Sequence, residues 1–141
     1  MKGVVAHKRT ASLESLVARA PLILVVDDSQ DIRELLRLHL SDAGYRVATA
    51  EDAVEAGHCV TRELPSLIIA DFKMPYMNGV DFIAALRADS TIPDLPVIFI
   101  TDGDASGEIA GRTFGFPLLT KPVRADTLLE TVADQLRKMA R

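Results

Sequence analysis

Two adjacent carboxylates, Asp27 and Asp28, directly follow the apolar run Leu22–Val26 near the start of the chain. An uninterrupted apolar run of this length is typical of a buried β-strand. Two carboxylates at the end of a buried strand repel each other and are costly to remove from water. A bound cation would offset that cost, and oxygen ligands of this kind suit Mg²⁺. The pair therefore predicts a buried strand that ends at a cation site.

Three further apolar runs also end next to a polar residue. The runs are 66–70, 96–100 and 118–120, and the residues that follow them are Asp71, Thr101 and Lys121. The run before Asp71 is apolar on both faces, as a central strand of a parallel sheet requires. Open parallel sheets place their functional groups at the edge where the carboxyl ends of the strands meet. We therefore expect acids, a hydroxyl and an ammonium to lie together at that edge.

Strand-like and helix-like patterns alternate from Leu22 to the C-terminus. The expected strands are 22–26, 45–49, 66–70, 97–100 and 118–120, and the expected helices are 29–43, 51–63, 80–88, 104–114 and 124–139. Five βα units in succession imply a parallel sheet with helices on both faces and right-handed crossovers. The fourth helix should be short or irregular, because its segment contains glycines that each cost a helix roughly 1 kcal/mol relative to alanine.

The composition restricts the classes of protein to which the chain can belong. A length of 141 residues suggests one domain with a proper core. The 16 basic and 20 acidic residues give a net charge of −4, which argues against direct nucleic-acid binding, because that needs a basic surface. A single cysteine excludes an internal disulfide, and no apolar stretch is long enough for membrane insertion. We therefore expect a globular, cytoplasmic protein.

An N-terminal extension, residues 1–20, precedes the alternating pattern. Residues 1–9 read as a loose arm, and Thr10–Ala20 has the apolar spacing of one short helix. Pro21 would end that helix. The extension is either a flexible tail or an amphipathic helix for docking or dimerisation, and the second alternative would allow a dimer.

Four motifs lie in order at the ends of the expected strands. They are Val25-Val26-Asp27-Asp28-Ser29, Asp71-Phe72-Lys73-Met74-Pro75-Tyr76-Met77-Asn78-Gly79, Ile100-Thr101 and Thr120-Lys121-Pro122. Together they resemble the receiver domain of two-component response regulators, of the single-domain chemotaxis-regulator kind, over residues 21–141. The resemblance implies an α/β, flavodoxin-like fold, which is a doubly wound, five-stranded parallel sheet of order 2-1-3-4-5 with helices on both faces.

The resemblance also implies a role for each matching acid. Asp71 matches the residue that accepts a phosphoryl group. Asp28 and Asp71 match direct ligands of Mg²⁺ or Mn²⁺, and Asp27 matches an acid that holds the ion mainly through water. The backbone carbonyl of Lys73 matches the remaining protein ligand.

Two further residues match groups that respond to the phosphoryl group. Lys121 matches the ammonium that pairs with the phosphoryl oxygens, and its bond to Pro122 is expected to be cis. Thr101 matches the hydroxyl that moves to hydrogen-bond the phosphoryl group. Electrostatics supports both roles, because transfer to a carboxylate requires neutralisation of the transferring oxygens.

Two positions depart from the family pattern and modulate these expectations. Asp102 stands where a small residue usually follows the switch hydroxyl, so it either repels the phosphoryl group and its donor or is a solvated loop acid that caps the next helix. Leu118 stands where an aromatic residue usually swings inward on activation, so the usual coupling between the switch threonine and an aromatic residue is lost. The side chain of Lys73 either pairs with the phosphoryl group or points to solvent.

The expected function is Mg²⁺-dependent phosphotransfer from a sensor histidine kinase or a histidine phosphotransfer protein to Asp71, which switches partner binding in a phosphorelay. We expect a signalling switch, not a dedicated enzyme, although it accepts phosphate and could dephosphorylate itself. A downstream protein would bind the surface of the fourth helix, fifth strand and last helix. The alternative is a constitutive interaction module, a pseudo-receiver that phosphorylation does not switch. A phosphatase fits less well, because its two acids would follow the same strand.

Overall fold

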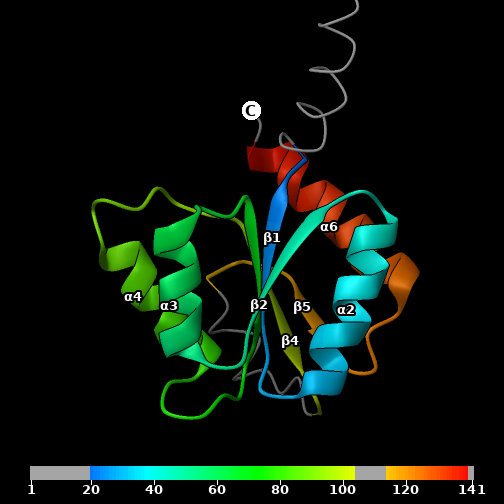
Figure 1. Ribbon diagram of the computed structural model, residues 1–141, viewed down its shortest axis with the longest axis horizontal. Coiled ribbons are helices and arrows are strands. Elements are labelled where there is room, and N and C mark those ends of the chain that lie inside the picture. The colour runs from blue at the N-terminus through cyan, green and yellow to red at the C-terminus, as the bar shows by residue number, and fades with distance from the viewer. Residues whose placement is uncertain (1–19, 104–113, 140–141) are drawn as a thin grey trace, which may run out of the picture.

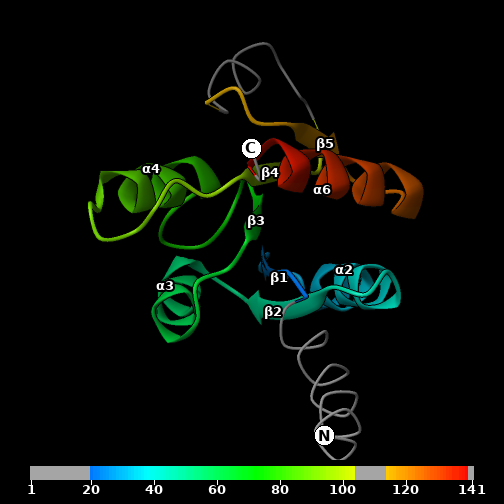
Figure 2. The ribbon, with the colours of Figure 1, turned by 90° about the horizontal axis from the view of Figure 1, so that it is seen from above.

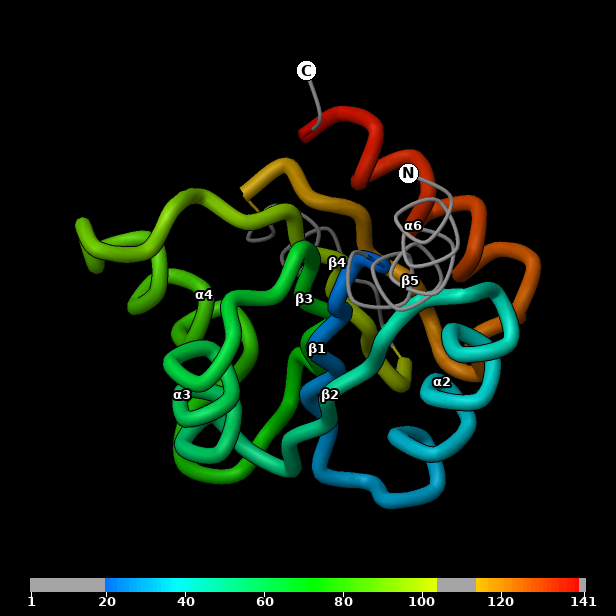
Figure 3. The backbone as a smooth tube through the Cα atoms, turned by 45° about the horizontal axis from the view of Figure 1, so that its top comes forward, coloured from blue at the N-terminus to red at the C-terminus, as the bar shows by residue number. Residues whose placement is uncertain are grey.

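A fully parallel, five-stranded sheet with the order β2-β1-β3-β4-β5 forms the centre of the molecule (Figure 1). The computed structural model describes residues 20–103 and 114–139. The strands are β1 (Leu22–Val26), β2 (Arg46–Ala50), β3 (Leu67–Asp71), β4 (Val97–Thr101) and β5 (Leu118–Thr120). The chain runs from β1 to the edge strand β2, returns to β3 and continues through β4 to β5, as the tube in Figure 3 shows. The flavodoxin-like arrangement implied by the sequence is confirmed.

Helices cover both faces of the sheet (Figure 2). Those in the described part of the chain are α2 (Gln30–Asp42), α3 (Ala53–Arg62), α4 (Gly79–Ala88) and α6 (Ala125–Met139). The helices α3 and α4 pack on one face, whereas α2 and α6 pack on the other. This two-sided cover is the architecture that successive βα units produce.

The core consists of two apolar layers, one on each face of the sheet. Leu24 and Val26 of β1 pack among side chains of α3 and α4. Ile23 and Val25 of the same strand pack among side chains of α2 and α6. Every residue of β1, β3 and β4 is buried, which explains the uninterrupted apolar runs in the sequence. Polar side chains therefore gather where these strands end, and that edge carries the candidate site.

The described helices and strands begin and end within one or two residues of the expected positions. The strand β2 starts one residue later than predicted, because the N–H of Tyr45 still donates to the carbonyl of Leu40 at the end of α2, at 3.1 Å. Gly44 allows this ending with a φ of 95°. Ser29 caps α2, as predicted, and α3 starts later than predicted because Asp52 is its N-cap.

Two predicted helices lie outside the described residues, except for one residue at the end of each. They are the segment Thr10–Ala20 and the fourth helix, 104–114, so the alternatives for both remain predictions. Of the helices that are described, none has the length and apolar character needed to cross a membrane.

Candidate functional site

The strand register brings three carboxylates together at the carboxyl edge of the sheet. Val26 of β1 pairs with Ala70 of β3, so the residues that follow them, Asp27 and Asp71, lie next to each other. Asp28 follows in the connection to α2, and one oxygen from each of the three carboxylates lies within 4.8 Å of the others. The three acids predicted as metal ligands therefore form one cluster.

Asp27 is the most deeply buried member of this cluster, with no exposed surface. Its Oδ1 accepts a hydrogen bond from the backbone N–H of Ser29 at 2.8 Å. Its Oδ2 lies 2.9 Å from Nζ of Lys121, but no group in the described part of the chain is aligned to donate a hydrogen bond to this oxygen. The contact with Lys121 is therefore an ion pair that leaves a buried carboxylate oxygen free to contact a further cation.

Asp71 is also nearly buried, with 4% of its surface exposed. Its Oδ1 accepts a hydrogen bond from the backbone N–H of Lys73, and its Oδ2 accepts one from Nζ of Lys121, both at 3.3 Å. Burial and the negative charge of Asp27 raise the pKa of Asp71 to about 6, and the Lys121 ammonium opposes them only in part. Asp28, in contrast, is exposed. The cluster thus carries negative charge that a divalent cation would relieve.

Lys121 reaches the carboxylates from the end of β5. Its backbone N–H donates to the carbonyl of Thr101 at 2.7 Å, which extends the contact between β4 and β5 beyond the strand. Its bond to Pro122 is cis, as the resemblance implies. The ammonium lies 2.9 Å from Asp27 and 3.3 Å from Asp71. Burial acts to lower the pKa of Lys121, but the two carboxylates outweigh burial and raise it, so the side chain is held as a cation.

The remaining predicted residues lie on β4, on β5 and in the connections that follow β3 and β4. Thr101 is buried at the end of β4, and it pairs with Thr120 of β5. Asp102 is exposed, which fits a solvated loop acid better than a carboxylate packed against Asp71. The side chain of Lys73 is exposed as well, so only its backbone N–H contacts Asp71. Leu118 is half-buried and packs against the apolar layer of α3 and α4.

Two further residues contact the site without a direct signal in the sequence. A Cβ on Gly79 would collide with the carbonyl oxygen of Asp71, so α4 begins in close contact with β3. The pair Asn78-Gly79 marks a turn in the sequence, but the close approach exists only when β3 and α4 are packed. Arg33 of α2 donates from Nη1 to the backbone carbonyl of Asp27 at 2.7 Å.

The set of donor atoms fits a hard divalent cation. The clustered ligand atoms are carboxylate oxygens, which Mg²⁺ and Mn²⁺ prefer. One of them, Oδ2 of Asp27, is buried without an aligned donor, and a second acid, Asp71, has a raised pKa. Both features are expected of carboxylates that are placed to hold a cation. The carbonyl of Lys73 as a further ligand remains a prediction.

A family model described as the response regulator receiver domain matches residues 23–133. Curated relatives include the response regulator MprA of Mycobacterium leprae, which is 39% identical over 118 residues, or 82% of this chain and 51% of that protein. The transcriptional regulatory protein GlrR of Escherichia coli K12 is 36% identical over 120 residues, or 84% of this chain and 27% of that protein. The chain thus spans about half the length of the first relative and about a quarter of the second.

Solved structures of similar fold cover the same part of the chain. The chemotaxis protein CheY4 of Vibrio cholerae superposes with a TM-score of 0.75 and 34% identity, covering 82% of this chain and 98% of that one. A sensor protein from Polaromonas sp. JS666 superposes with a TM-score of 0.76 and 28% identity, covering 84% and 98% of the two chains. The fold, the acidic cluster at the strand ends and the family match agree, and the chain belongs to the response regulator receiver domain family.

Proposed function

We propose that the chain is a phosphorylation switch in which Asp71 accepts a phosphoryl group from a phosphohistidine of a sensor kinase or a phosphotransfer protein. The position of Lys121 carries the proposal, because its ammonium lies between Asp27 and Asp71, at 2.9 and 3.3 Å. Asp28 completes the acidic cluster beside this pair. An acceptor carboxylate, further acids for a cation and an ammonium for the phosphoryl oxygens are the groups that phosphoryl transfer to an acid requires.

In the proposed step, a carboxylate oxygen of Asp71 attacks phosphorus and the P–N bond of phosphohistidine breaks. The imidazole nitrogen leaves with the bonding electrons and takes up a proton. Asp71 must be ionised to attack, and a pKa of about 6 leaves most of it ionised at pH 7. Lys121 lies within 3.3 Å of the acceptor and can neutralise the transferring oxygens. Mg²⁺ bound by the acidic cluster would supply further positive charge against the same oxygens.

The signal would leave the site through β4. A phosphoryl group adds roughly −1.5 to −2 charge, by analogy with phosphoserine. Thr101 lies at the end of the strand next to Asp71 and is buried, so its hydroxyl is a donor that the new charge can attract. Movement of Thr101 would displace the connection that begins at Asp102. The outcome would be a changed binding surface, so we propose a switch and not an enzyme that turns over a separate substrate.

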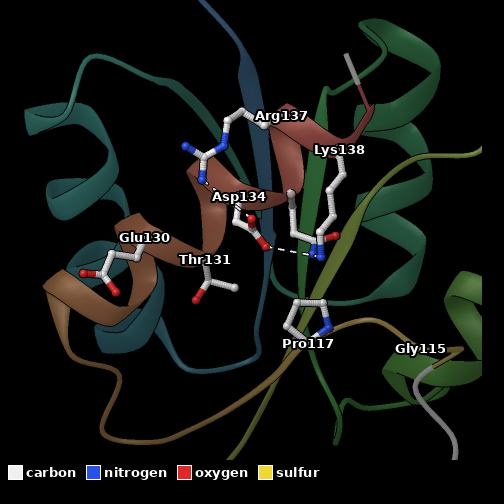
Figure 4. A pocket seen from close by; sticks show the side chains of 8 residues that line it. Gly115, Pro117, Glu130, Thr131, Asp134, Arg137 and Lys138 are labelled. Carbon is white, nitrogen blue, oxygen red and sulfur yellow. Dashed lines mark ion pairs between the residues drawn. The ribbon is translucent and has the colours of Figure 1, made fainter. Parts of the chain in front are cut away.

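The downstream protein partner would bind the face formed by β5 and α6, in the cytoplasm. A groove on this face lies between the segment that leads into β5 and the helix α6 (Figure 4). Its lining residues are Gly115, Pro117, Glu130, Thr131, Asp134, Gln135, Arg137 and Lys138. Within it, Asp134 lies 3.6 Å from Arg137 and 3.3 Å from Lys138. A groove that carries both signs of charge favours a polar partner segment over an apolar one.

A constitutive interaction module is the second candidate, and Leu118 favours it. This residue replaces the usual aromatic side chain, and it is already packed against the apolar layer of α3 and α4. A leucine that is already packed would lose apolar contacts by moving, so we expect it to change position on phosphorylation less than an aromatic side chain that swings inward. Phosphorylation of Asp71 without a change in the β5–α6 face would favour this candidate.

The direct test of the acceptor is intact mass after incubation with Mg²⁺ and acetyl phosphate. We expect one phosphate adduct on the wild type, none on Asp71→Asn, and little or none on the wild type in EDTA. An adduct of equal amount on Asp71→Asn would place the acceptor elsewhere. A wild type that binds Mg²⁺ but gains no adduct would favour the constitutive module, and phosphorylation of Asp102→Ala would then identify Asp102 as the obstacle.

A further inference from the structure

We infer that Arg33 is a positioning residue for the cation site, because it fixes the backbone from which Asp28 projects. Its Nη1 donates a hydrogen bond to the carbonyl oxygen of Asp27 at 2.7 Å. That oxygen belongs to the peptide unit that joins Asp27 to Asp28, so the contact holds the plane of this peptide. The inference rests on the proposed function, since it assigns a further residue to the same site.

Asp28 is the carboxylate that most needs such support. Asp27 is fully buried and accepts a hydrogen bond from the N–H of Ser29. Asp71 is nearly buried and accepts two hydrogen bonds, both at 3.3 Å. Asp28 is exposed, and within the described part of the chain no hydrogen bond or ion pair holds its carboxylate. Its position therefore depends on the backbone before it, and Arg33 holds that backbone.

Arg33 is itself anchored well enough to do this. Its backbone N–H donates to the carbonyl of Ser29 at 3.1 Å, so the residue belongs to the first turn of α2. Ser29 caps the same helix and also donates its N–H to Oδ1 of Asp27 at 2.8 Å. The side chain of Arg33 and the backbone of Ser29 thus hold the Asp27 carbonyl and the Asp27 carboxylate from one rigid element. A planar guanidinium suits this role, because its donors have a fixed geometry.

The positioning role of Arg33 strengthens Mg²⁺ binding, whereas its positive charge would weaken Mg²⁺ binding. A guanidinium close to the acidic cluster repels a divalent ion, so loss of its charge alone would tighten Mg²⁺ binding. Loss of a residue that orients a ligand weakens metal binding, typically 10–100-fold. The sign of the change on removing Arg33 therefore distinguishes a positioning role from a purely electrostatic one.

Arg37 provides a matched control on the same helix. It lies one turn further along α2, and its Nη2 donates to Oγ1 of Thr49 on β2 at 3.1 Å, not to the acidic cluster. Arg37→Met removes the same charge from the same helix and leaves the contact with Asp27 intact. Arg33→Lys keeps the charge and can still donate to the Asp27 carbonyl, although without the fixed geometry of a guanidinium.

The experiment is calorimetric titration of the whole chain with MgCl₂, for the wild type, Arg33→Met, Arg33→Lys and Arg37→Met. We expect Arg33→Met to bind Mg²⁺ about tenfold more weakly, at the low end of the range for such residues. Arg33→Lys should lie between this variant and the wild type, and Arg37→Met should match the wild type. Saturating Mg²⁺ should restore the rate of phosphorylation of Arg33→Met by acetyl phosphate, because the variant changes the affinity and not the reacting groups.

Thermal unfolding in EDTA establishes which variants are folded. If Arg33→Met does not fold, Arg33→Gln and Arg33→Lys are compared with the wild type instead. Equal or tighter Mg²⁺ binding after loss of the Arg33 guanidinium would overturn the inference, as would an equal weakening in Arg37→Met. These outcomes leave the proposed function intact as long as the wild type binds Mg²⁺. A wild type that binds no Mg²⁺ would instead refute the proposed function and the inference together.

Discussion

At the scale of single residues, the ionisation of Asp71 should couple folding to pH. Its pKa is raised to about 6 in the folded protein, from an ordinary value of 3.8, because the carboxyl is buried beside Asp27. The folded state therefore binds more protons than the unfolded state between these two values, and stability falls as pH rises through this window. At pH values above this window, the buried negative charge of Asp71 lowers the stability of the folded state by its full amount unless a cation is bound.

The prediction is that Asp71→Asn melts at a higher temperature than the wild type at pH 7 in EDTA, and that the difference shrinks towards pH 4. Thermal unfolding of both proteins from pH 4 to 7 measures this, and excess Mg²⁺ should reduce the difference at pH 7. Asp102→Asn is the control, because Asp102 is exposed and its variant should follow the wild type. A difference between Asp71→Asn and the wild type that does not change with pH would contradict the account.

Tyr76 has a strained backbone conformation in the loop between β3 and α4. The N–H of Met77 donates to the carbonyl of Pro75 at 2.8 Å, and Tyr76 between them has a φ of 70°. This is a γ-turn with a positive central φ, the rarer and more strained form. The residue is 92% exposed, so packing offsets little of the strain.

Replacing Tyr76 by glycine should therefore stabilise the protein. We expect Tyr76→Gly to raise the free energy of unfolding by roughly 0.5–1 kcal/mol, because glycine adopts positive φ without a Cβ clash. Urea unfolding measures the change. Lys73→Gly, in the same loop at a residue without positive φ, should be neutral or destabilising, and a similar gain there would show that loop flexibility and not strain is responsible.

At the scale of elements, the contact between α4 and β3 depends on Gly79. A Cβ at this position meets the carbonyl oxygen of Asp71, so Gly79→Ala must push the start of α4 away from β3. We expect a loss of about 1–3 kcal/mol in the free energy of unfolding, as for other overpacked sites. Urea unfolding checks this value, and the amide signals of residues 71–79 should move most.

Gly57 gives the matched opposite case. It lies inside α3, and a Cβ there would meet nothing within 4 Å. Gly57→Ala should therefore stabilise the protein by roughly 0.5–1 kcal/mol, since alanine is the better helix former. The two Gly→Ala variants should change stability in opposite directions, and a change of the same sign in both would mean that Gly79 is not in close contact with β3.

At the scale of the whole molecule, the sequence predicts the sheet order and the acidic cluster because a few residues are decisive. Asp27, Asp28 and Asp71 follow apolar runs that are typical of buried parallel strands, so their proximity follows once the strand order is known. The order itself came from the resemblance to a family, since periodicity alone does not choose among parallel topologies.

The contacts that the sequence does not predict are those made by tertiary packing. Asn78-Gly79 reads as a turn, yet the function of Gly79 is its approach to Asp71, which depends on how α4 lies on β3. Arg33 is one of several basic residues in the expected helices, and its contact with the Asp27 carbonyl appears only when α2 is packed on the sheet. The ionisation of Asp71 likewise depends on burial and on distances that no linear pattern contains.

We propose that phosphorylation of Asp71 changes the face formed by β5 and α6. The most direct measurement compares amide NMR spectra of the protein in Mg²⁺ with and without acetyl phosphate, using Asp71→Asn as the control. The account predicts that signals shift at Asp71, Thr101 and Lys121 and also along β5 and α6, and that none of these shifts occurs in the variant. A phosphate adduct on Asp71 with shifts confined to the acidic cluster would contradict this proposal and identify a constitutive module.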